Sequence, residues 1–114
     1  MAINELALVA EIQHQLNGDL LSYGWLRQIV RDLEPTIDRK MIAKLVYDAV
    51  VRLYDSGYAI VGTAKEIDGK VLVVPWDGTR HEVLSRLDRF MTTAGDSPVQ
   101  DDLNVFWLER TSLL

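Results

Sequence analysis

Cysteine is absent from this chain of 114 residues, and proline and histidine are scarce, with three and two copies. Without cysteine the chain forms no disulfide, has no thiolate nucleophile and offers no cysteine-ligated zinc site. Such a composition is typical of a reducing compartment. No apolar run approaches the roughly 20 residues of a membrane span, and the N-terminal residues lack the basic start and cleavage site of a signal peptide. We therefore expect a cytoplasmic protein that makes no contact with a membrane.

Residues that carry out catalysis are equally sparse. His14 and His81 fall on different predicted helices, and neither has a second ligand at the spacing that a metal site needs. Nucleophile elbows, phosphate-binding loops and dinucleotide fingerprints are missing. Asp96, Asp101 and Asp102 crowd one loop, but the alternating oxygen ligands and the closing glutamate of a calcium loop are not there. The sequence thus predicts a protein that is not an enzyme and that has no metal or cofactor.

The rest of the composition is that of a folded protein, with 48% hydrophobic and 25% charged residues. The length fits one domain over residues 1–114. The net charge of −5 is unevenly distributed, because residues 22–52 have six basic and four acidic side chains, whereas residues 53–114 have six basic and ten acidic ones. The acidic balance argues against nonspecific nucleic-acid binding, which depends on neutralising phosphates. The basic middle segment leaves specific DNA binding open.

Three helices are predicted in the first half of the chain. Apolar residues recur at helical spacing over residues 3–16. Ser22 is the predicted N-cap of a second helix, which Pro35 ends, and Asp38 is the predicted N-cap of a third. The residues expected in the core are, helix by helix, Leu6, Val9, Ala10 and Leu16; Leu26, Ile29, Val30 and Leu33; and Met41, Ile42, Leu45, Val46, Ala49, Val50 and Leu53. The residues expected on the solvent side of the second helix are Arg27, Arg31 and Asp32.

A β-hairpin is predicted over residues 58–74, where the apolar period changes to two. Asp68-Gly69 is a strong turn signal, because both central residues of a tight hairpin turn need positive φ. A fourth helix follows, and Thr79 and Glu82 have the spacing of a capping box at its start. Trp76, between the hairpin and this helix, is expected to fill the core rather than to stack on a ligand.

The resulting order is three helices, a hairpin, a fourth helix and a final strand over residues 103–109. Three helices followed by a hairpin, with a tight connection at Pro35, is the order of a winged helix. The sequence therefore predicts an α+β fold of the winged-helix type. Because an edge strand invites pairing, we also expect homodimerisation through the first helix or the last strand.

One functional interpretation is DNA binding. In a winged helix the third helix enters the major groove and the hairpin touches the phosphate backbone. Arg39, Lys40 and Lys44 are the candidate DNA-contacting residues of the third helix. Asp48 and Asp55 lie on the same helix, and the hairpin tip has two lysines and two acidic residues. DNA binding is favoured if these three basic side chains are exposed together and free of ion pairs, and it is disfavoured if acidic neighbours neutralise them.

The other interpretation comes from a resemblance. The chain has LYDSGY at residues 53–58, VPWD at 74–77, RLD at 86–88 and VFWLERT at 105–111. These segments resemble small bacterial winged-helix-like proteins that serve as immunity partners of contact-dependent and polymorphic toxins. The resemblance covers residues 22–111. The family has a glycine after the final threonine, where this chain has Ser112.

The resemblance implies a protein that binds a cognate toxin domain tightly and blocks its active site. Many such toxins are nucleases with basic substrate clefts, to which an acidic partner is attracted electrostatically. The candidate toxin-contacting residues are the acidic side chains of the hairpin tip and of the following loop: Glu66, Asp68, Asp96, Asp101 and Asp102. We expect an immunity protein, with a winged-helix transcriptional regulator as the alternative.

Overall fold

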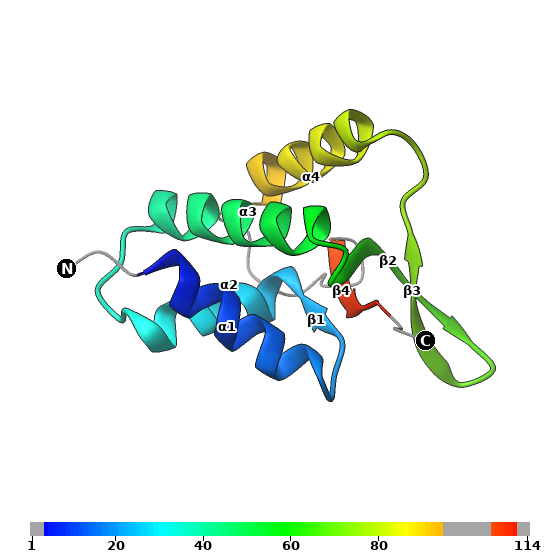
Figure 1. Cartoon of the computed structure of the whole chain (residues 1–114), viewed down its shortest axis with the longest axis horizontal. Helices are drawn as coiled ribbons and strands as arrows, with labels where there is room; N and C mark the ends of the chain where they lie inside the picture. Colours follow the sequence, from blue (N-terminus) through cyan, green and yellow to red (C-terminus); the bar gives the residue numbers. More distant parts are fainter. Residues whose placement is uncertain (1–3, 95–105, 112–114) are drawn as a thin grey trace.

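The computed structural model describes residues 4–94 and 106–111, with side chains omitted for 92–94. These residues form an α+β fold of four helices and one four-stranded antiparallel sheet (Figure 1). In chain order the elements are α1 (Glu5–Leu16), β1 (Leu21–Ser22), α2 (Tyr23–Leu33), α3 (Arg39–Asp55), β2 (Ala59–Ile67), β3 (Lys70–Pro75), α4 (Arg80–Ala94) and β4 (Phe106–Arg110).

The α+β class is confirmed, but the predicted order of elements is wrong at one point. A strand, β1, lies between α1 and α2, where the sequence predicts only a connection. It is two residues long, which is too short to show an alternating pattern. Leu21 and Ser22 pair with Leu108 and Trp107 of β4, so β1 is defined by its partner strand rather than by its own sequence.

The strand order is β1-β4-β2-β3, so the last strand of the chain lies inside the sheet. On one side β4 pairs with β1, and on the other it pairs with β2, with Leu108 opposite Val61. The prediction that the last strand offers a free edge for dimerisation is therefore wrong. In the described part of the chain the edge strands are β1 and β3.

The helix starts follow the capping chemistry predicted from the sequence. The Ser22 hydroxyl accepts from the backbone N–H of Trp25 at 3.2 Å, and an Asp38 carboxylate oxygen accepts from that of Lys40 at 2.8 Å. At α4 the Thr79 hydroxyl accepts from the N–H of Glu82 at 3.2 Å. Each cap satisfies a backbone donor that the first helical turn leaves without a partner.

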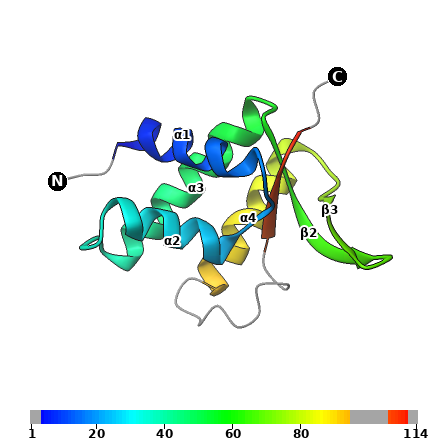
Figure 2. The same ribbon diagram turned by 90° about the horizontal axis from the view of Figure 1, so that it is seen from below.

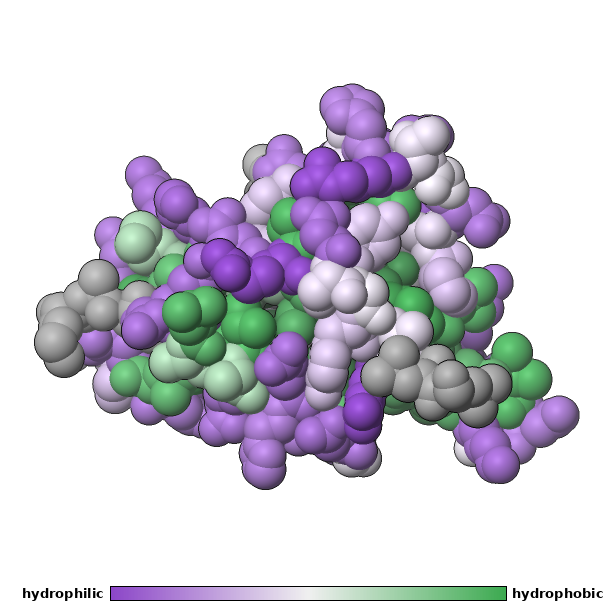
Figure 3. All heavy atoms as spheres, in the orientation of Figure 1, coloured by the Kyte–Doolittle hydropathy of each residue, from purple (hydrophilic) through white to green (hydrophobic). Residues whose placement is uncertain are grey.

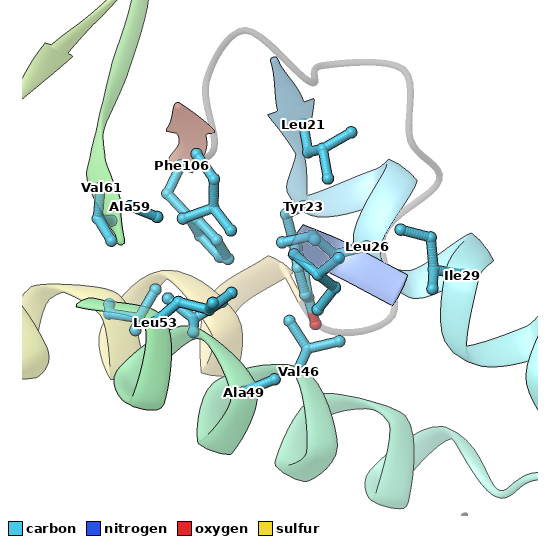
Figure 4. Packing of buried hydrophobic residues seen from close by; sticks show 14 of the residues in the cluster. Leu21, Tyr23, Leu26, Ile29, Val46, Ala49, Leu53, Ala59, Val61 and Phe106 are labelled. Carbon is cyan, nitrogen blue, oxygen red and sulfur yellow. The ribbon is translucent and has the colours of Figure 1, made fainter. Parts of the chain in front are cut away.

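The core lies between the helices and one face of the sheet. Helix α3 is central, since α1, α2 and α4 all pack against it (Figures 1 and 2). Phe106 of β4 is fully buried, and its ring centroid lies 5.3 Å from that of Tyr23. Figure 4 shows Phe106, Tyr23, Val46 and Leu53 converging from β4, α2 and α3. The broad apolar face predicted for the third helix is thus confirmed, except that Met41 is exposed.

Four other burial predictions are wrong, two on α1 and two on α2. On α1 the buried residues are Leu8, Val9, Ile12 and Leu16, whereas Leu6 is 62% exposed and Ala10 is also exposed. On α2 Leu33 is exposed, and Arg27 is buried with its guanidinium 4.7 Å from the centre of the Tyr23 ring. The stacking explains how a cationic side chain is accommodated on the inner side of α2.

Candidate protein-interaction surface on the hairpin

The β2–β3 hairpin projects from the body of the molecule (Figures 1 and 2). The strands are joined by a two-residue turn in which Asp68 and Gly69 have φ values of 53° and 78°. Two consecutive positive φ values are those of the tight turn predicted from Asp68-Gly69, which matches the twist of the flanking strands. The turn fixes the register, with Ile67 opposite Lys70 and Lys65 opposite Leu72.

Trp76 fixes the base of the hairpin. Its backbone N–H donates to the Val61 carbonyl at 3.1 Å, and its indole N–H donates to the Thr63 hydroxyl at 2.9 Å. The ring is buried and stacks on Phe90 of α4 with 5.3 Å between centroids. The guanidinium of Arg86 lies over the indole, 4.5 Å from its centre. The expectation that Trp76 fills the core is confirmed, and this packing holds the hairpin at a set angle to α4.

The projecting part of the hairpin exposes four large apolar side chains. Ile67, Val71, Leu72 and Val74 are 48%, 45%, 44% and 37% exposed. Because directly opposite residues point to the same side of a sheet, Ile67, Leu72 and Val74 share one face and Val71 lies on the other. Figure 3 shows apolar atoms on the hairpin, at the lower right, with hydrophilic atoms at its tip. We call these four residues with Glu66 and Asp68 the hairpin surface.

The acidic residues of the tip are both accessible. Glu66 and Asp68 are exposed, and neither makes a hydrogen bond or ion pair within the part of the chain that the structure describes. Lys65 and Lys70 flank them and are also exposed. The other three acidic candidates, Asp96, Asp101 and Asp102, lie outside the described residues. The structure therefore places two of the five predicted contact residues, and it places them together.

The predicted DNA-contacting residues lie at the start of α3. Arg39, Lys40 and Lys44 are all exposed. The Lys44 ammonium lies 3.2 Å from the Asp48 carboxylate one turn further along the helix. Arg52, later on the same helix, lies 3.0 Å from Glu5 of α1. The basic side chains of α3 are thus exposed together but are not all free of ion pairs.

A further ion pair joins α3 to α4. The Arg80 guanidinium donates two hydrogen bonds of 2.8 Å to the Asp55 carboxylate. These hydrogen bonds and the adjacent positive charge lower the pKa of Asp55 below its ordinary value, and the same contacts raise the pKa of Arg80. Acidic and basic residues therefore alternate and pair along the exposed side of α3, which reduces its attraction for phosphates.

In residues 4–94 and 106–111, no group of three or more histidine, aspartate or glutamate side chains is arranged to hold a metal ion. Within the same residues no helix combines the length and the apolarity that crossing a membrane requires. Comparisons of the chain with family models, with curated proteins and with solved structures find no match.

The exposed apolar part of the hairpin surface is not apparent from the sequence. Residues 71–74 read Val-Leu-Val-Val, which has no alternation of polar and apolar side chains to mark an exposed face. A run of this kind is typical of a strand that is covered on both sides. Only the strand order, which leaves β3 at an edge and beyond the reach of the helices, makes Val71, Leu72 and Val74 accessible.

Proposed function

We propose that this chain is an immunity protein that neutralises a cognate toxin domain by direct contact, and that the hairpin surface makes this contact. The observation that carries the proposal is the exposed apolar face of Ile67, Leu72 and Val74 on a projecting, firmly anchored hairpin, next to the turn at Asp68 and with Glu66 on the other face. Exposed apolar clusters rimmed by polar residues are typical of protein-binding sites. A rigid base lowers the entropic cost of binding.

The two exposed carboxylates of the hairpin tip suit basic groups of a partner, while Lys65 and Lys70 bring the net charge of the tip to zero. Pairing of Glu66 and Asp68 with basic side chains of a cleft favours association in one orientation of the complex. The substrate clefts of nucleases are basic because they bind phosphates. A nuclease toxin is thus the partner that we propose, and the sequence resemblance to immunity proteins supports the same choice.

The winged-helix interpretation of the fold supports the proposal as well. The order of α1, β1, α2, α3 and the β2–β3 hairpin corresponds to that of a winged helix. In this chain β4 lies between β1 and the hairpin, and α4 packs against α3. We interpret the fold as a variant of the winged helix in which α4 and β4 are integral to the core and the hairpin serves protein binding.

The alternative function is a DNA-binding transcriptional regulator. The shared exposure of Arg39, Lys40 and Lys44 favours it. The ion pair between Lys44 and Asp48 counts against it, because a paired lysine must break this contact before it binds a phosphate. With zero net charge over Lys65, Glu66, Asp68 and Lys70, the hairpin tip also lacks the positive charge of a phosphate-gripping wing.

The test is an affinity purification of the tagged chain from its native host, followed by mass spectrometry and an assay for nucleic acid in the eluate. We expect one stoichiometric protein that is retained at high salt and that the chain inhibits. Recovery of DNA that is released as salt increases would overturn the proposal in favour of the regulator, because phosphate contacts are lost steeply with ionic strength.

The contact surface is tested with the identified toxin and a double variant, Glu66→Gln with Asp68→Asn, which removes both charges. Asparagine tolerates the positive φ of residue 68, so the turn is preserved. We expect association at low salt to slow by about tenfold, since accessible charges act mainly on the association rate. The matched control is Asp88→Asn, which neutralises an exposed carboxylate of α4. Equal rates for the double variant and the control would exclude the hairpin tip as the contact.

A further inference from the structure

The outer edge of β3 has backbone groups that point away from the sheet. The N–H of Trp76 donates to the Val61 carbonyl of β2 at 3.1 Å. Successive residues of a strand turn their backbone groups to opposite sides, so Leu72 and Val74 also bond to β2, whereas Val71 and Val73 point outward. Among residues 4–94 and 106–111, no strand pairs with this outer side. Val71 and Val73 therefore present two N–H and two C=O groups in an extended row along this edge.

This edge lacks the features that usually prevent strands of different molecules from pairing. Proteins protect edge strands by making them very short or by placing charges, prolines or bulges along them. The opposite edge strand, β1, is only two residues long. In β3 the lysine and the proline stand at the two ends, Lys70 and Pro75, and the four residues between them are all apolar. An unprotected edge strand of this kind is able to pair with a strand of another molecule.

We propose that the partner is a second copy of this chain, paired antiparallel through β3 about a two-fold axis at Leu72. In this register Val71 of each copy lies opposite Val73 of the other, so all four outward N–H groups of the two copies meet outward carbonyls. Pro75, which has no N–H to donate, falls outside these pairs. The pairing joins the two four-stranded sheets into one.

The side chains of β3 suit this register. The two Leu72 side chains meet on the axis as a non-hydrogen-bonded pair, in which side chains approach most closely. Val74 of each copy faces the aliphatic stem of Lys70 of the other, beside Ile67 of that copy. Three of the exposed apolar side chains are thereby covered. The charged residues of the hairpin, Lys65, Glu66, Asp68 and Lys70, sum to zero, so the two hairpins do not repel each other despite the net charge of −5.

In this register Asp68 of each copy comes level with Trp76 at the base of the other hairpin. Because the pairing also covers Ile67, Leu72 and Val74, toxin contact through the hairpin surface requires the monomer, and dimerisation competes with it. This inference does not depend on the proposed function, since it concerns the purified chain alone. A chain that binds no toxin can still dimerise, and a toxin-binding chain can be monomeric, so failure of one proposal is distinguishable from failure of the other.

The experiment is sedimentation equilibrium of the purified chain over a range of concentrations up to about 1 mM. We expect the apparent mass to rise from 12.9 kDa toward twice this value. Leu72→Lys places two ammonium groups opposite each other on the axis, and we expect it to raise the dissociation constant by at least about tenfold. Val71→Pro removes an outward N–H without disturbing the bonds to β2, and should weaken the dimer as well. The matched control, Leu6→Lys, changes an exposed leucine of α1 and should have no effect.

The register is tested by single cysteine variants, which are informative because the chain has no other cysteine. Leu72→Cys should form an intermolecular disulfide readily, since opposite residues of a non-hydrogen-bonded pair lie about 4.5 Å apart at Cα. Val71→Cys should not, because its copies are offset from each other along the strands. A monomer at every concentration would overturn the proposal. So would a dimer that Leu72→Lys leaves intact.

Discussion

Gly62 has a specific role at the residue scale, because it lets β2 and β3 approach each other closely. A Cβ atom at this position would fall on the Val74 carbonyl, 2.6 Å from its carbon, and 2.9 Å from the Cα of Pro75. These are backbone atoms, which cannot rotate away as a side chain can. On the other side of β2, the register with β4 places Trp107 opposite Gly62. Glycine is thus required here by space and not by backbone dihedral angles.

We therefore expect Gly62→Ala to lower the free energy of unfolding by about 3 kcal/mol, at the upper end of overpacking effects. Chemical denaturation monitored by circular dichroism measures this change. Gly18→Ala is the matched control, because a Cβ at Gly18 has no neighbour within 4 Å. The control should change stability by less than about 1 kcal/mol. A Gly62→Ala variant as stable as this control would show that β3 shifts freely relative to β2.

Individual residues were predictable from the sequence where their role is local. The caps Ser22, Asp38 and Thr79 and the turn at Asp68-Gly69 depend on bonds to residues within three positions, and the structure confirms all of them. Arg27 was not predictable, because its burial depends on the Tyr23 ring and the surrounding packing. Leu6 and Ala10 of α1 have the same helical spacing as a buried stripe, and it is the packing of α1 against α2, α3 and β4 that selects the buried face.

At the scale of elements, Asp55 and Arg80 connect the end of α3 to the start of α4. The pKa of Asp55 is lowered in the folded protein by hydrogen bonds from Arg80 and by its charge. A carboxyl group with a lowered folded pKa stabilises the fold above its unfolded pKa, and this contribution is lost as pH falls through the folded pKa. Arg80 stays charged throughout this range because its pKa is raised.

We expect Asp55→Asn to be less stable than the unchanged chain at neutral pH. The difference should shrink to zero as the pH falls below the folded pKa of Asp55, where the unchanged chain also lacks the carboxylate. Thermal unfolding at a series of pH values measures this. Because both side chains are solvent-exposed, the effect at neutral pH is small and should decrease with added salt. Asp88→Asn serves as the control, and a difference that persists at low pH would contradict the ion-pair explanation.

One part of the hairpin surface was predictable from the sequence and another part was not. The hairpin, its turn and the acidic residues Glu66 and Asp68 were all predictable, because a change of period and a turn signal mark them. The exposure of β3 was not, since it depends on which strand lies next to which. The strand order is fixed by the packing of β4 between β1 and β2, and these three strands are far apart along the chain.

At the scale of the whole molecule, α4 and β4 are part of the core and not additions to a complete smaller domain. Strand β4 joins β1 to β2, so without it the sheet divides into a hairpin and an isolated two-residue strand. The buried side chains that α4 and β4 supply are Val83, Leu87, Met91, Phe106 and Leu108. Burial of one such side chain contributes about 1.5–3 kcal/mol. Together these side chains contribute about 7.5–15 kcal/mol, which is comparable to the roughly 5–15 kcal/mol by which a domain is usually stable.

A chain that ends at Gly78 keeps the three helices and the hairpin but loses this part of the core. We expect it to show no cooperative thermal transition by circular dichroism, and to bind a hydrophobic dye at the apolar surfaces that α4 and β4 cover in the full chain. A chain that ends at Thr111 retains every described element and should unfold cooperatively, which controls for the loss of the chain end. A cooperative transition in the shorter chain would mean that the helices and the hairpin form a folding unit by themselves. The packing of Phe106 between Tyr23 and Trp76 argues against this, because both rings would lose the neighbour that buries them.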